Sequence, residues 1–235
     1  MTAIKRAACF LACAILAGCA HVPESRQPLL DRAIDAAGGE AALGNAERLI
    51  WEGDAEVHVQ GRAIALGVRS DIVPLGRVRA ESWLEDKGPA SMRILELDGR
   101  QGWATRNGKK EVLARNMAEN EYEQFGTYGL MRLVSLRAAG VRTAEIGEDA
   151  MGLQGLRVNY PGLPEATLWF DGQARLKALT NTVSSPDGGK RINQRFEFGG
   201  SVGANGIIWP REISISQDGK PFFDLTITQF ETRPK

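Results

Sequence analysis

Cysteine is nearly absent from this chain of 235 residues, and the three that occur, Cys9, Cys13 and Cys19, all lie close to its start. Beyond Cys19 there is no thiol that could form a disulfide, act as a nucleophile or bind a metal as a thiolate. Burial and hydrogen bonding must therefore stabilise the body of the protein.

Histidine is almost as rare, because only His21 and His58 occur. No HExxH, Walker, Gly-x-Ser-x-Gly or zinc-binding spacing is found. His58 alternates with Glu56 and Gln60, which favours the solvated face of a strand over an acid–base or metal-binding role. A hydrolase would need a serine that meets His58 in a cleft, and the sequence singles out none. We therefore expect no enzymatic activity, no metal and no cofactor.

The chain also lacks an excess of charge, since 29 Lys and Arg balance 29 Asp and Glu. Proteins that bind nucleic acid carry clustered positive charge, so we expect no nucleic-acid partner. No long apolar run follows the first twenty residues. The body of the chain is long enough for one sizeable domain with a real core.

The start of the chain predicts export. Lys5 and Arg6 precede an apolar run over residues 7–17, which is typical of a secretory signal and too short to span a bilayer. The run ends in Leu16-Ala17-Gly18-Cys19, which resembles the lipobox of bacterial lipoproteins. The resemblance implies cleavage before Cys19 and its acylation with long chains such as palmitate. Because Ala20 follows instead of aspartate, it also implies an outer-membrane anchor that faces the periplasm of a Gram-negative bacterium.

Three parts of the chain are thus expected: a lipoprotein signal over residues 1–18, a tether over 19–28 and one domain over 29–235. The domain opens with apolar residues at helical spacing from Leu29 to Ala37, and Gly38-Gly39 ends that helix. A short second helix is expected over 40–47. A third is expected over 116–139, which Gly126 and Gly129 could break into two pieces.

The rest of the domain alternates apolar and polar residues, which predicts strands. Turn dipeptides such as Asp98-Gly99, Asn107-Gly108 and Asp218-Gly219 separate them. Consecutive strands joined by short turns pair antiparallel. We expect about ten or eleven strands, among them 54–60, 77–85, 90–97, 153–160, 166–170, 174–183, 190–198, 207–216 and 221–231.

Several short motifs resemble the proteins with the LolA/LolB-like fold. The motifs are Ala-Gly-Gly-Glu-Ala-Ala-Leu (37–43), Leu-Ile-Trp-Glu-Gly (49–53), Leu-Asp-Gly-Arg-Gln-Gly-Trp (97–103), Leu-Trp-Phe-Asp (168–171) and Gly-Ile-Ile-Trp-Pro (206–210). The resemblance implies an α+β fold in which a curved antiparallel sheet forms an open half-barrel and helices pack on its concave face. It also implies a cavity between sheet and helices that holds acyl chains, notably those of lipoproteins.

Seven large apolar side chains are the candidates to line such a cavity: Trp51, Leu66, Trp103, Phe125, Leu130, Leu133 and Trp169. Each of them could equally belong to a packed core. We therefore expect a lipid-anchored, non-enzymatic protein that binds a lipid, an acyl chain or a lipoprotein. The alternative is an envelope protein–protein interaction or structural module with a filled interior and no ligand.

Overall fold

The computed structural model describes residues 27–234. The signal over residues 1–18, with Leu16, Ala17 and Gly18, lies outside the described residues, as do Cys19 and the tether up to residue 26. The helices are α1 (Leu29–Ala36), α2 (Glu40–Asn45) and α3 (Arg115–Met131), with two short 3₁₀ turns, η1 (Gly88–Ser91) and η2 (Val134–Arg137).

The remaining elements are strands. Their bounds are β1 (Arg48–Val59), β2 (Arg62–Ile72), β3 (Arg77–Leu84), β4 (Arg93–Asp98), β5 (Gln101–Arg106), β6 (Lys109–Val112), β7 (Arg142–Glu148), β8 (Gln154–Asn159), β9 (Ala166–Phe170), β10 (Leu176–Val183), β11 (Ile192–Gly199), β12 (Val202–Ala204), β13 (Ile207–Trp209), β14 (Glu212–Gln217) and β15 (Lys220–Arg233).

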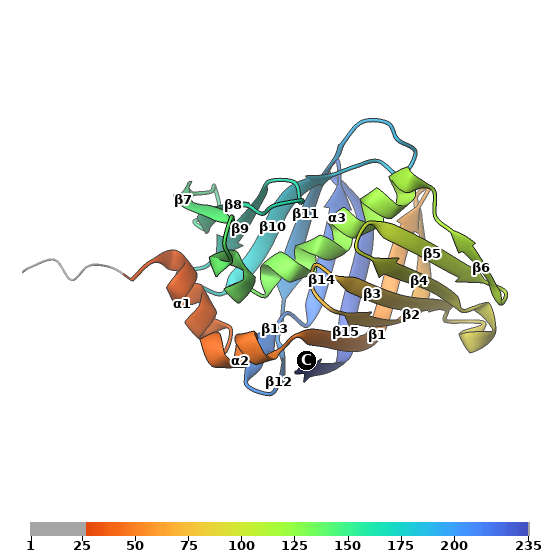
Figure 1. Ribbon diagram of the computed structural model, residues 1–235, viewed down its shortest axis with the longest axis horizontal. Coiled ribbons are helices and arrows are strands. Elements are labelled where there is room, and N and C mark those ends of the chain that lie inside the picture. The colour runs from red at the N-terminus through yellow and green to blue at the C-terminus, as the bar shows by residue number, and fades with distance from the viewer. Residues whose placement is uncertain (1–26, 235) are drawn as a thin grey trace, which may run out of the picture.

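Thirteen of these strands form one curved antiparallel sheet, in the order β6-β5-β4-β3-β2-β1-β15-β14-β11-β10-β9-β8-β7. β6 and β7 are its two edges, and α3 connects them in the sequence. The helix therefore crosses the concave face, while α1 and α2 lie at one end of the sheet (Figure 1). This confirms the expected α+β fold, an open half-barrel with helices on the concave face.

The sheet has more strands than the ten or eleven expected. The sequence reading missed β6, β7 and the short β12, and it merged β13 with β14. β6 is wholly exposed and β7 almost so, because edge strands carry charged residues and have no buried face to produce an alternating pattern. Pro210, which lacks an N–H to donate, separates β13 from β14.

The possible break in the third helix does not occur, because α3 runs through both glycines to Met131. A Cβ at Gly126 would lie 2.6 Å from Leu163 Cδ2, and one at Gly129 would lie 2.6 Å from Leu75 Cγ. The two glycines therefore let the loops after β8 and β2 approach the helix closely. Their helical cost of about 1 kcal/mol each is offset by this packing.

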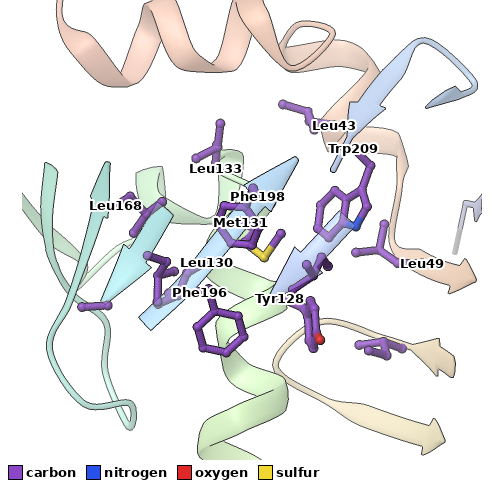
Figure 2. Packing of buried hydrophobic residues seen from close by; sticks show 14 of the residues in the cluster. Leu43, Leu49, Tyr128, Leu130, Met131, Leu133, Leu168, Phe196, Phe198 and Trp209 are labelled. Atoms are coloured by element: carbon purple, nitrogen blue, oxygen red, sulfur yellow. The ribbon is translucent and has the colours of Figure 1, made fainter. Parts of the chain in front are cut away.

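The first two helices close one end of the half-barrel. Gly38, with φ of 117°, separates α1 from α2, and the Ile208 N–H donates a hydrogen bond of 2.9 Å to the Ala37 carbonyl. This contact holds the β12–β13 hairpin against the helices. Leu43 of α2 and Trp209 of β13 enter the same buried cluster as the end of α3 (Figure 2).

Candidate functional site

An apolar cavity of about 350 Å³ lies between α3 and the strands of the first half of the sheet, with β11, β14 and β15 completing its wall. Its inner end is aromatic. The ring of Tyr128 on α3 packs against Trp51, with 5.0 Å between the ring centroids. It meets the ring of Phe196 edge-on, with 6.5 Å between the centroids. All three side chains are buried, and Phe125 and Leu66 extend the apolar lining. The cavity is therefore apolar where it is deepest (Figure 2 shows Tyr128 and Phe196 at this end of the core).

The other end of the cavity is charged and open to solvent. Arg93 on β4 and Arg106 on β5 are paired directly across the two strands, and both are exposed. The next residues inward on the same face are Leu95 and Ala104, which are also paired. Because side chains alternate between the faces of a strand, the arginines and this apolar pair line one surface of the cavity.

Glu121 is the carboxyl group that α3 contributes to the cavity. Burial raises its pKa to about 7, and the positive charge of Arg93 offsets part of this rise. Burial and the charge of Arg106 in turn lower the pKa of Arg93. The cavity thus combines two cationic groups with an acid that is partly protonated near neutral pH.

The seven residues proposed from the sequence lie in different places. Trp51, Leu66 and Phe125 line the cavity. Leu130 is buried in the core at the end of α3, and Leu133 lines a separate hollow beside α1.

The two remaining tryptophans lie on the outer face of the sheet. Trp103 follows the strand alternation of β5, so its side chain points to the face away from Ala104. The Lys110 ammonium lies 5.3 Å from the centroid of the Trp103 ring. Trp169 alternates with the buried Leu168 and Phe170, and its Nε1 donates to Thr180 Oγ1 at 3.2 Å. Neither tryptophan is among the residues that line the cavity.

Sequence reasoning overlooked Tyr128, Phe196, Glu121 and the arginine pair. The sequence carried no signal for the pair. A two-residue turn centred on Asp98-Gly99 would place Arg93 opposite Ala104, whereas the observed turn lies over Gly99 and Arg100 and places Arg93 opposite Arg106.

His58 has a partner, but its surroundings are not those of a catalytic site. Its Nε2 lies 2.7 Å from Asp224 Oδ2, on the face of the sheet opposite Val57 and Phe223, which line the cavity. Ser214 is the cross-strand partner of Asp224, and it forms no hydrogen bond with His58 among the described residues. The described residues place no nucleophile against the imidazole in a cleft.

Residues 27–234 also bear on metal binding and on membrane insertion. No group of three or more His, Cys, Asp or Glu side chains in this part of the chain could hold a metal ion. None of its helices is long and apolar enough to cross a membrane.

No family model and no curated protein matches the sequence. Solved structures do match the fold. A LolA superfamily protein from Nitrosomonas europaea has a TM-score of 0.56 at 11% identity, covering 88% of this chain and 93% of its own. A putative outer-membrane lipoprotein-sorting protein domain from Vibrio parahaemolyticus has a TM-score of 0.54 at 7% identity, covering 86% and 91%.

A DUF1329 family protein from Desulfovibrio piger is similar to the same degree, with a TM-score of 0.55 at 8% identity over 87% of this chain and 91% of its own. At such low identity the likeness concerns the backbone. The TM-scores above 0.5 extend over most of this chain and of each neighbour. The protein therefore has a LolA-like fold.

Proposed function

We propose that this protein is a non-enzymatic, lipid-anchored component of the outer membrane that faces the periplasm and binds an acyl chain of a lipid or lipoprotein. The observation that carries the proposal is the apolar cavity of about 350 Å³ between α3 and the sheet. Ligand pockets for small molecules occupy roughly 300–1,000 Å³ and are mostly apolar.

The size of the cavity suits one alkyl chain. Taking about 30 Å³ per small group, the share of one water in the liquid, the cavity holds roughly a dozen methylenes. Each methylene removed from water contributes about 0.8 kcal/mol, so a dozen supply about 10 kcal/mol before the costs of association are subtracted. Burial alone can thus retain such a chain, and no catalytic group is required.

The neighbouring structures support the same class of ligand. The Vibrio parahaemolyticus domain is described as a lipoprotein-sorting protein. The lipobox ending in Cys19 supports an envelope location, since an acylated Cys19 would keep the body of the protein at a membrane surface.

Native mass spectrometry of the full chain carrying Cys19→Ser tests the cavity. We expect gently purified protein to carry a lipid adduct of one chain. Ala104→Phe fills the cavity and should abolish the adduct, whereas Ala65→Phe places the same ring on the exposed face of β2 and should retain it. Absence of an adduct from both the parent and the Ala65→Phe chain would favour the alternative, an interaction module without a ligand.

Membrane fractionation tests the anchor separately. The wild-type chain should sediment with outer membranes, and the Cys19→Ser chain should leave them. Retention of the Cys19→Ser chain in membranes would contradict anchoring by an acyl group.

A further inference from the structure

The charged end of the cavity narrows the class of ligand, and this step rests on the proposed binding of an acyl chain. We infer that the cavity takes an anionic single-chain amphiphile, with its alkyl chain against the aromatic inner end and its carboxylate or phosphate headgroup between the guanidinium groups of Arg93 and Arg106.

The first argument is the register of β4 and β5. Arg93 and Arg106 are direct cross-strand partners on the face that lines the cavity, where the side chains of a pair start about 4.5–5.5 Å apart. Like charges in this position repel each other. An anion between the two guanidinium groups would turn the repulsion into two attractions.

The second argument is that no described residue, across 27–234, forms a salt bridge with either arginine. The acids of the neighbouring strands are already engaged. Glu81 and Glu96 lie on the opposite face and pair with Arg79 and Lys110, and Glu111, which shares the face of Arg106, pairs with Lys109. The charge of Glu121 on α3 raises the pKa of Arg93, but Glu121 forms no salt bridge with either arginine.

The third argument is the orientation of the site. The arginines are exposed and the aromatic end is buried, so an amphiphile can enter with its chain first and leave its headgroup at the opening. Guanidinium groups bind carboxylate and phosphate oxygens through paired hydrogen bonds, and they are desolvated more readily than ammonium groups. Ser82 on β3 is the cross-strand partner of Arg93 and adds a hydroxyl to the same opening.

Three ligands with the same chain separate the headgroup from the alkyl contribution: dodecanoate, dodecyl phosphate and 1-dodecanol. Each is titrated into the full chain carrying Cys19→Ser, and binding is followed by tryptophan fluorescence, to which Trp51 in the cavity contributes. We expect at least one of the anions to bind about tenfold more tightly than the alcohol, as charge-assisted hydrogen bonds predict. Preference for dodecyl phosphate would indicate the headgroup of a single-chain lysophospholipid, and preference for dodecanoate would indicate a free fatty acid.

The variants identify the residues. Arg93→Gln/Arg106→Gln should reduce the affinity for the preferred anion to that for dodecanol and leave dodecanol binding unchanged. Arg93→Lys/Arg106→Lys keeps both charges but loses the paired hydrogen bonds, so its affinity for the anion should lie between those of the parent chain and the double glutamine variant. Arg195→Gln, which removes an arginine from the outer face of β11 that pairs with Glu197, should change nothing.

Equal affinity for the alcohol and the anions in the parent chain would overturn the headgroup site and leave the proposed function standing. Loss of dodecanol binding in the double glutamine variant would also overturn the headgroup site. The arginines would then maintain the shape of the whole cavity instead of binding the anion. Failure of all three ligands to bind the parent chain would overturn the proposed function and this inference with it.

Discussion

Glu121 should make the stability of the folded protein depend on pH. Its carboxyl group is half-buried at the cavity, and burial raises its pKa from 4.5 to about 7. The folded state therefore binds this proton more tightly than the unfolded state does. The stabilisation is complete below pH 4.5 and is lost as the pH rises to about 7, because a charged carboxylate must then remain shielded from water.

The size of the effect follows from the shift. One pKa unit corresponds to about 1.36 kcal/mol, so the rise from 4.5 to about 7 corresponds to at most about 3 kcal/mol. Glu121→Gln keeps the shape of the side chain and removes its ionisation. The variant should match the wild type near pH 4.5 and exceed its free energy of unfolding by up to about 3 kcal/mol at pH 8.

Urea denaturation followed by tryptophan fluorescence at pH 4.5 and pH 8 measures this difference. All other titrating groups are common to the two chains, so their contributions cancel. Glu111→Gln, which changes an exposed carboxylate on β6, controls for the change in net charge. A difference between Glu121→Gln and the wild type that is equal at the two pH values would refute the argument from burial.

The remaining predictions concern stability measured by the same urea titrations. Gly38→Ala should lower the free energy of unfolding by at least about 2 kcal/mol, because φ is 117° and the new Cβ would lie 2.1 Å from the Gly206 carbonyl oxygen. Gly44→Ala in α2 is the control, because its Cβ meets nothing within 4 Å and the change should stabilise the protein by up to about 1 kcal/mol. Equal effects of the two substitutions would contradict this reasoning. Gln194→Met should raise the free energy of unfolding by about 1 kcal/mol, since the buried amide has no hydrogen-bond partner among the described residues, and a loss would show that the amide is satisfied. Trp51→Ala should cost about 3–5 kcal/mol by removing a side chain that is only 2% exposed, and a cost below about 1 kcal/mol would show that the inner end of the cavity is loosely packed.

Most of the sheet could be predicted from local pattern. β1 alternates between Ala55 and Val57 on one face and Glu56 and His58 on the other, and its partner strands repeat the pattern. The turn dipeptides then set the antiparallel order. The first helix was equally readable, because Gly38-Gly39 ends it where the apolar spacing stops. These features depend on residues that are close together in the sequence, so the amino-acid sequence by itself is enough to predict them.

The helix glycines show where local propensity is insufficient. Gly126 and Gly129 favour a break when only the helix is considered, yet α3 continues through both. The deciding contacts come from Leu163 and Leu75, which are distant in sequence. Tertiary packing thus outweighed a cost of about 1 kcal/mol at each position.

The cavity could be predicted as a kind of site but not as a set of residues. Trp103 and Trp169 are as large and apolar as Trp51, yet they lie on the outer face of the sheet. Alternation shows which residues share a face, but it does not show which face is concave. That choice depends on the curvature of thirteen strands and on where α3 crosses them.

The sequence alone determined the antiparallel order of most strands and the absence of thiol chemistry beyond Cys19, and it predicts an anchor at that residue. Tertiary structure alone decided that α3 covers the concave face, that Trp51 meets Tyr128 and Phe196 there, and that Arg93 and Arg106 stand at the opening opposite Glu121. The physical reason is that signals, turns and strand periodicity are encoded over a few residues. A cavity forms only where elements far apart in the chain fail to fill the space between them.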